Sequence, residues 1–104
     1  MSRYSHTWRV PRGTTPETAL KNQIKQYLKY KRFFVFPILQ TLGAYKGVAD
    51  LIALRKDTGV VFLEIKRPGG KQSLYQQQFQ ANVEAHGGKY LLVKSVDDLI
   101  KAGF

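Results

Sequence analysis

The stretch Val61-Phe62-Leu63-Glu64-Ile65-Lys66 places two opposite charges at the end of an otherwise apolar run. Valine, isoleucine and phenylalanine favour extended backbone, and successive side chains of a strand point to opposite faces. Glu64 and Lys66 therefore share one face, while Ile65 points to the other. Burying a charge costs free energy unless the charge is paired or binds a ligand. The stretch predicts a buried strand whose end carries either an ion pair or a ligand site.

The preceding apolar run supplies a second carboxylate, Asp50. A short turn ending at Gly59 joins the two runs, and a three-residue loop with left-handed Gly59 would pair Lys56 with Val60. That register puts Asp50 on the same face as Glu64, diagonal to it. Two carboxylates this close repel each other unless a cation lies between them.

A hard divalent cation suits a site that holds two carboxylates. Mg²⁺ takes oxygen ligands and keeps waters that a phosphate can displace. Such an ion would polarise a phosphodiester and lower the pKa of its bound water. The competing interpretation is structural, with Glu64 and Lys66 forming an ion pair at the strand end and Asp50 capping a turn. We expect Mg²⁺ or Mn²⁺ at this site and no organic cofactor.

The overall charge of the chain indicates a polyanionic partner. Its 104 residues include 17 Lys and Arg against 7 Asp and Glu, a net charge of +10. Such an excess favours nucleic acid, with an anionic membrane surface or a solvated basic surface as alternatives. The absence of cysteine excludes disulfides and thiolate metal sites. No apolar run reaches the roughly 18 residues that a membrane span needs, so we expect no membrane partner. The N-terminal residues lack the apolar segment of a secretory signal, so we expect none.

Turn residues and hydrophobic periodicity divide the chain into an arm and one domain. Residues 1–13 are basic, with Tyr4 and Trp8 interleaved, and predict an N-terminal arm. Residues 14–104 form the predicted domain. Its predicted elements are a helix at 15–30, strands at 33–38, 48–55 and 60–66, a helix from 73 to the glycines at 87–88, a strand at 89–93 and a helix at 95–102. The order αβββαβα predicts an α/β fold.

Three segments of the sequence resemble a known nuclease family. They are Lys46-Gly47-Val48-Ala49-Asp50, Phe62-Leu63-Glu64-Ile65-Lys66 and Ser73-Leu74-Tyr75-Gln76. These segments look like the PD-(D/E)XK nuclease superfamily and, within it, the VRR-NUC family, and the resemblance extends from Glu17 to Leu99. It implies a restriction-endonuclease-like core, a mixed central sheet flanked by helices. Ala49 stands where the family commonly has Pro, and Leu74-Tyr75 where Pro-Glu is usual, but neither change removes a ligand.

The resemblance implies a role for each charged residue of the strand end. Asp50 and Glu64 would bind the metal, and we add the main-chain carbonyl of Ile65 as a further expected donor. Lys66 would assist the attacking water. These four positions carry the predicted chemistry of the site.

Two further residues join the site by resemblance, and each has a competing structural role. Gln76 would support the metal strand, but its spacing from Ser73 is that of a capping box at the start of a helix. Glu17 would join the site from the first helix, although an acid in a first helical turn is also explained by the helix dipole. Both interpretations stay open from the sequence.

Basic and aromatic residues around the predicted site are candidates for holding a nucleic-acid backbone. We expect them to contact phosphates without reading bases. A solvated basic face is the alternative for all of them. The candidates are Lys21, Lys25, Tyr45, Lys46, Arg67 and Lys71.

The sequence thus predicts a metal-dependent, structure-selective DNA endonuclease. Minimal stand-alone members of the resembling family suggest resolution of four-way (Holliday) junctions, and symmetric resolution implies a homodimer. A flap nuclease and a non-catalytic, basic nucleic-acid-binding module are the alternatives. We expect the protein in the cytoplasm of a bacterial cell or a phage-infected host.

Overall fold

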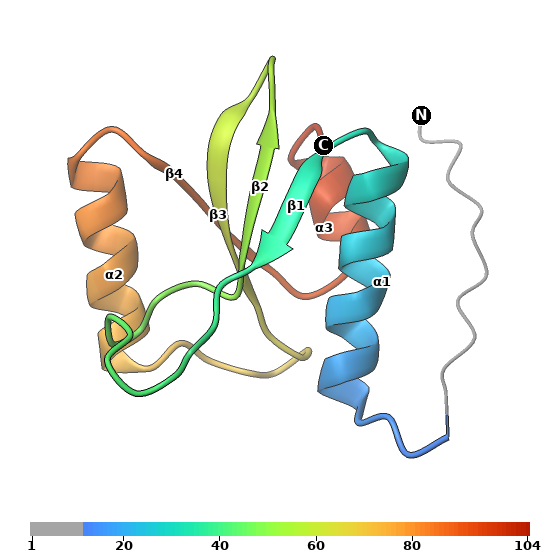
Figure 1. Cartoon of the computed structure of the whole chain (residues 1–104), viewed down its shortest axis with the longest axis horizontal. Helices are drawn as coiled ribbons and strands as arrows, with labels where there is room; N and C mark the ends of the chain where they lie inside the picture. The colour runs from blue at the N-terminus through green and yellow to red at the C-terminus, as the bar shows by residue number, and fades with distance from the viewer. Residues whose placement is uncertain (1–11) are drawn as a thin grey trace.

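The structure is a computed structural model that describes residues 12–104, so all but the last two residues of the predicted arm lie outside the described residues. Within this range no helix is long and apolar enough to cross a bilayer. The elements in chain order (Figure 1) are α1 (Pro16–Tyr30), β1 (Phe34–Pro37), β2 (Leu51–Arg55), β3 (Gly59–Ile65), α2 (Leu74–Ala85), β4 (Lys89–Val93) and α3 (Val96–Lys101). The predicted order αβββαβα is confirmed.

The four described strands form one mixed sheet in the order β1-β2-β3-β4. β1 pairs with β2 and β2 with β3 in antiparallel fashion, whereas β3 and β4 run parallel. The parallel pair needs a crossover connection, which α2 supplies. Pro37 lies at the end of β1, an edge strand, where its missing N–H leaves no gap inside the sheet. The predicted mixed α/β fold is confirmed.

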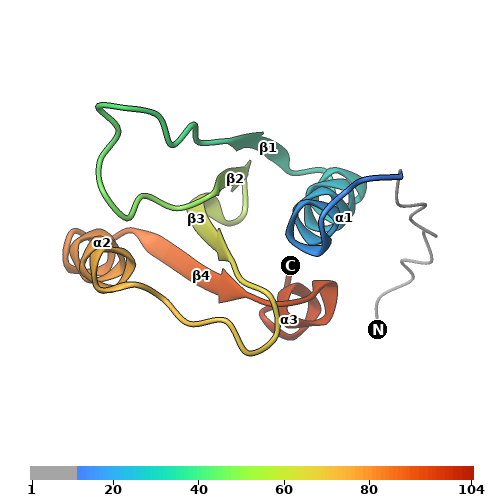
Figure 2. The ribbon, with the colours of Figure 1, turned by 90° about the horizontal axis from the view of Figure 1, so that it is seen from below.

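Helices cover both faces of the sheet, with α1 and α3 on one side and α2 on the other (Figure 2). The main core lies under α1, where Ile24, Tyr27 and Leu28 pack against buried residues of the strands. On the opposite face, Phe79 of α2 contacts Phe62 of β3 at a ring distance of 5.4 Å. The ends of β2 and β3 nearest the α2 N-terminus are therefore held between two helical layers.

The register of the β2–β3 hairpin differs from the prediction by two residues. Arg55, not Lys56, closes the turn, opposite Gly59. The loop keeps its predicted three residues but comprises residues 56–58. The Thr58 N–H donates to the Arg55 carbonyl, and the Arg55 guanidinium pairs with Asp57 inside the turn, which stabilises this closing pair. The predicted left-handed glycine is confirmed, with φ of 70°. Because the shift is even, the two carboxylates remain on the face that the sequence predicted.

Candidate active site

Asp50 is fixed in the sheet at the point where the 38–50 loop enters β2. Its N–H donates to the Leu63 carbonyl at 3.0 Å, and its carbonyl accepts from the Ile38 N–H at 2.8 Å. One carboxylate oxygen, Oδ2, accepts from the Ile65 N–H at 2.7 Å. The side chain therefore reaches across to the end of β3, which brings it beside the strand that carries Glu64.

Lys21 of α1 occupies the other side of the Asp50 carboxylate. Its Nζ lies 3.2 Å from Asp50 Oδ1 and 3.5 Å from Glu17 Oε1. Burial opposes the charge of Lys21, but the neighbouring carboxylates outweigh it and raise its pKa above the ordinary value. Lys21, predicted as a contact to the DNA backbone, thus lies inside the carboxylate cluster.

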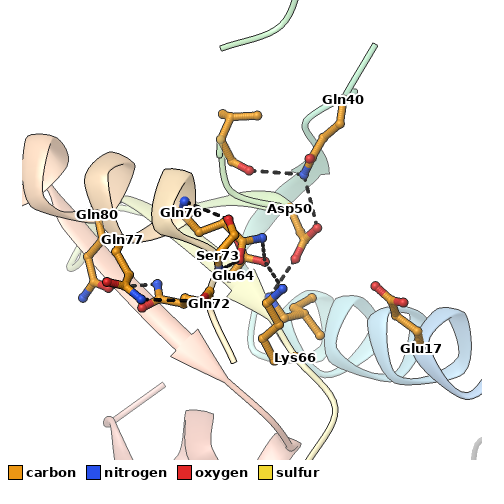
Figure 3. Close-up of polar contacts among 12 residues, drawn as sticks. Glu17, Gln40, Asp50, Glu64, Lys66, Gln72, Ser73, Gln76, Gln77 and Gln80 are labelled. Carbon is orange, nitrogen blue, oxygen red and sulfur yellow. Dashed lines mark hydrogen bonds and ion pairs between the residues drawn. The ribbon is translucent and has the colours of Figure 1, made fainter. Parts of the chain in front are cut away.

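Glu17 is a peripheral member of this cluster. Its side chain is 59% exposed, and in the structure it lies on α1, apart from Glu64 (Figure 3). Among the described residues, its ion pair is with Lys21, which in turn contacts Asp50. Glu17 is therefore linked to Asp50 through the ammonium group of Lys21.

Glu64 is the buried acid of the site, with only 1% of the residue exposed. Its Oε2 accepts from Gln76 Nε2 at 3.1 Å and lies 4.0 Å from Lys66 Nζ. Its Oε1 is buried and accepts no hydrogen bond within residues 12–104, while the carboxylate of Asp50 is a close neighbour of Glu64. Burial, and after it the nearby charge of Asp50, raise the pKa of Glu64 to about 8. A carboxylate in this setting gains stability from any cation that approaches its unpartnered oxygen.

Gln76 makes hydrogen bonds that agree with both interpretations left open by the sequence. Its side-chain Oε1 accepts from the Ser73 main-chain N–H at 2.8 Å, and the main-chain N–H of Gln76 donates to Ser73 Oγ at 3.1 Å. This is the predicted capping box at the start of α2. The other end of the same amide, Nε2, donates to Glu64 (Figure 3). One side chain therefore caps the helix and orients the buried acid.

Gly47 sets the distance between the loop before Asp50 and α2. Its φ is +80°, a conformation that L side chains rarely adopt. A Cβ at this position would overlap the carbonyl of Tyr75 and lie 2.7 Å from the Gln76 nitrogen. The loop therefore lies directly on the first turn of α2, which fixes Asp50 and Gln76 relative to each other.

Three residues around the carboxylates were not predicted from the sequence. Gln40 Nε2 donates to the Val48 carbonyl at 3.2 Å and lies 3.4 Å from Asp50 Oδ1. Gln72 Nε2 donates to the Tyr90 hydroxyl at 3.1 Å. Burial, followed by the charge of Glu64, raises the pKa of Tyr90 to about 12. No local pattern marks these residues, because the loop path and the parallel β3–β4 register bring them to the site.

The remaining predicted contacts to nucleic acid lie on three segments of the chain: α1, the segment after β3 and the loop before Asp50. Lys25 lies half-buried on α1, one turn beyond Lys21. Arg67 and Lys71 are exposed on the segment that follows β3. The other two members of the predicted set, Tyr45 and Lys46, lie on the loop before Asp50 and line a surface pocket with residues of α2.

The donor atoms of the site fit a hard divalent cation. Residues 12–104 contain no group of three or more His, Cys, Asp or Glu side chains that could hold a metal. The site instead offers the two carboxylates of Asp50 and Glu64, one of them with an unpartnered oxygen. Mg²⁺ is commonly held by one or two carboxylates, with waters and substrate oxygens completing its shell. The predicted third donor, the Ile65 carbonyl, follows Glu64 directly in β3.

Known proteins resemble this chain in structure rather than in sequence. No protein-family model matches the sequence, and no curated protein matches it. A solved structure described as a "VRR_NUC domain" is similar with a TM-score of 0.75 and 22% identity, covering 88% of this chain and 100% of that chain. Another, described as a "VRR_NUC domain protein", has a TM-score of 0.68 and 17% identity, covering 83% of each chain. The chain therefore has the fold of VRR_NUC domains, as the resemblance implied.

Proposed function

We propose that this chain, which has the VRR_NUC fold, is a member of the VRR-NUC family and hydrolyses DNA phosphodiesters with Mg²⁺ or Mn²⁺. One observation carries the proposal: the buried Oε1 of Glu64 accepts no hydrogen bond from residues 12–104, and a second carboxylate, that of Asp50, lies beside Glu64. An ion pair alone would leave this buried oxygen unsatisfied, because Lys66 Nζ lies 4.0 Å from the other oxygen, Oε2. The geometry therefore favours a ligand site over a strand-end ion pair.

Each residue of the site has a separate task in this proposal. Asp50 and Glu64 would hold the cation, which supplies a Lewis acid for the phosphodiester and a more acidic water. Lys66 shares the face of Glu64 and places a positive charge where the phosphoryl group develops negative charge. Gln76 holds Glu64 in one orientation, and Lys21 does the same for Asp50.

Glu17 is proposed as a supporting residue rather than a ligand. Its ion pair with Lys21 limits the movement of the ammonium that contacts Asp50. The predicted role of Glu17 in the site is thus supported by a bridge and not by direct contact with Asp50.

The substrate class follows from charge and from the family resemblance. A net charge of +10 supports binding to a nucleic-acid backbone, to which Lys25, Arg67 and Lys71 would contribute. We propose a branched DNA substrate, with four-way junctions first and flaps second. Symmetric cutting of a junction would require two copies of this site, hence a homodimer. The cytoplasm of a bacterium or of a phage-infected cell is the proposed location.

The proposal is tested by comparing the wild-type protein with a Glu64→Gln variant, which keeps the shape of the buried side chain. Both would be incubated with labelled four-way junction, flap, single-stranded and duplex DNA in Mg²⁺, Mn²⁺ or EDTA. We expect metal-dependent cutting that falls at least about 100-fold in the variant, while DNA binding is retained. Paired, symmetric nicks in the junction would identify a resolvase.

The second candidate is a non-catalytic nucleic-acid-binding module, which the basic composition alone would also support. It predicts salt-sensitive binding and no cutting by the wild-type protein with either metal. That outcome would overturn the nuclease proposal.

A further inference from the structure

A pocket of about 300 Å³ lies between the loop before Asp50 and the first turns of α2. Its walls are Tyr45, Lys46, Tyr75 and Gln78. None of these residues holds the carboxylates of the candidate active site. The pocket is therefore a separate feature of the surface, with its own chemistry.

Two exposed tyrosine rings give the pocket an aromatic character. Tyr45 is 62% exposed and Tyr75 is 52% exposed, although both rings are large and apolar. Tyr45 is held from behind, because its ring lies 5.9 Å from that of Phe79 and its hydroxyl accepts from Asn82 at 3.4 Å. A ring that is fixed and still exposed loses little conformational entropy when a flat partner stacks on it.

Polar groups complete the walls. The Nζ of Lys46 lies 5.0 Å from the centre of the Tyr75 ring, a cation–π contact that keeps a positive charge at the pocket. Gln78 contributes an amide that can both donate and accept hydrogen bonds. Aromatic faces, a cation and an amide together suit a nucleobase and its phosphate, since bases stack on aromatic side chains and present hydrogen-bonding edges.

The pocket is tied to the candidate active site through the backbone. Lys46 precedes Asp50 by four residues, so their Cα atoms are at most about 14 Å apart. Tyr75 directly precedes Gln76, which holds Glu64. The close packing of Gly47 on α2 fixes the two walls of the pocket against each other. A nucleic acid whose phosphate lies at the carboxylates therefore has a neighbouring nucleotide within reach of the tyrosines.

We propose that this pocket binds an unpaired nucleobase next to the phosphodiester that is hydrolysed at the carboxylate site. The inference rests on the proposed nuclease function and names the structural feature of the substrate. A base inside a continuous duplex is stacked on both sides and cannot offer its face to Tyr75. Bases at a flap, a gap, a strand end or a branch point can do so, and stacking accepts any of the four bases. The pocket would thus select unpaired DNA without reading its sequence.

Another, larger pocket is less suited to such a role. It has a volume of about 430 Å³ and is lined by Tyr30, Lys31, Arg32 and Arg55. It lies at the C-terminal end of α1, about 15 Å along the helix from the turn that carries Lys21. Its Arg55 is already paired with Asp57. This larger pocket is far from the carboxylates, and its Arg55 is engaged by Asp57. The pocket lined by Tyr45 and Tyr75 is therefore the better candidate for contacting the substrate.

The test measures binding in EDTA, where no metal-dependent cutting occurs. The probes are a labelled single-stranded oligonucleotide, the same oligonucleotide with abasic spacers, and a fully paired duplex. The proteins are wild type, Tyr75→Ala, Tyr75→Phe and, as a matched control on the same helical turn, Leu74→Ala, which alters an exposed large hydrophobic residue outside the pocket. Thermal melting of each variant checks that the fold is intact.

We expect Tyr75→Ala to weaken binding of the single strand by roughly 5- to 150-fold, the range that loss of one stacked base predicts. Binding of the duplex and of the abasic strand should stay within about twofold of wild type, because neither offers a base to the ring. Tyr75→Phe keeps the ring and should behave like wild type, as should Leu74→Ala.

Two results would overturn the pocket proposal. An equal loss on all three probes would assign Tyr75 a general role in charge or folding. A Tyr75→Phe variant as weak as Tyr75→Ala would assign binding to the hydroxyl and not to stacking. The wild-type cutting assay separates these failures from failure of the nuclease proposal. Base-dependent binding without any cutting refutes the nuclease and supports the pocket, whereas cutting without base-dependent binding does the reverse.

Discussion

Glu64 is an acid buried at a strand end, and its protonation is coupled to folding. Burial and the charge of Asp50 raise its pKa from about 4.5 to about 8 in the folded protein. Between these two values the folded state holds a proton that the unfolded state has released, so the free energy of unfolding falls as pH rises. Below pH 4.5 both states are protonated and the favourable contribution is fully present. Above pH 8 it is lost.

The first prediction concerns this pH dependence in the absence of metal. In EDTA, the free energy of unfolding of wild type minus that of Glu64→Gln should fall by a few kcal/mol between about pH 5 and pH 8.5. The variant cannot titrate at position 64, so it serves as the reference for all other groups. Urea unfolding at five or six pH values measures both proteins. Parallel curves would show that Glu64 titrates at its ordinary pKa.

Gln76 offers a second prediction for a single side chain. Gln76→Ala removes both the cap of α2 and the donor to Glu64, and should destabilise the protein by about 1–3 kcal/mol. Gln76→Glu is the matched control, because its carboxylate can still accept from the Ser73 N–H. We expect this control to retain most of the stability at pH 5 and to lose it at pH 9, where two carboxylates would face each other. Urea midpoints at the two pH values measure the difference.

At the scale of elements, the approach of the 38–50 loop to α2 depends on Gly47. The third prediction compares Gly47→Ala with Gly43→Ala. Both glycines have positive φ, +80° and +93°, but a Cβ at Gly43 meets nothing within 4 Å. Gly43→Ala should cost about 1 kcal/mol from backbone strain alone, whereas Gly47→Ala should cost about 2–4 kcal/mol. Equal urea midpoints for the two variants would show that the loop can move away from α2.

Secondary structure near the site was predictable because its determinants are local. The capping box at Ser73, the proline at the end of an edge strand and the alternation around Glu64 each depend on neighbours in the sequence. The placement of Glu64 and Lys66 on one face followed from the two-residue period of a strand. The hairpin register was wrong because an ion pair inside the turn, between Arg55 and Asp57, selected the closing pair.

The rest of the site depends on packing between distant segments. Lys21 reaches Asp50 only because α1 packs across the end of β2, and no pattern in α1 distinguishes Lys21 from its neighbouring lysines. Tyr90 approaches Glu64 through the parallel register of β4, which the crossover helix sets. Gln40 lies in a loop whose path follows no repeat. Such contacts become visible only when the whole sheet is assembled.

For the whole molecule, binding of a cation should be coupled to stability. A ligand that binds only the folded state raises the free energy of unfolding, by about 2.7 kcal/mol when its concentration is 100 times the dissociation constant. The fourth prediction is that Mg²⁺ or Mn²⁺ raises the Tm of wild type, more at pH 8.5 than at pH 6, because the cation competes with the proton on Glu64. Glu64→Gln should show little shift. A similar shift in both proteins would place the bound cation elsewhere.

The charge of the molecule leads to a fifth prediction, about binding to DNA. With a net charge of +10, affinity for duplex in EDTA should fall steeply as salt rises, with a slope set by the number of phosphates contacted. The double variant Arg67→Ala/Lys71→Ala removes two exposed cations. It should reduce the slope of log affinity against log salt concentration by about 1–2 units and leave the Tm within about 2 °C of wild type. An unchanged slope would remove these two residues from the DNA interface. Fluorescence anisotropy across a salt series measures it.

The shared amide of Gln76 has a consequence for how this chain can evolve. The backbone of Ser73 fixes which end of the amide faces inward, so only the amino end is presented to position 64. A replacement must accept a hydrogen bond at one end and donate one at the other, and among side chains of this length glutamine alone meets both demands. Drift at position 76 is therefore constrained twice over, by helix α2 and by Glu64. A lineage that abandoned catalysis and lost Glu64 would be released from the second demand, and the cap of α2 alone would then admit glutamate as well as glutamine at position 76.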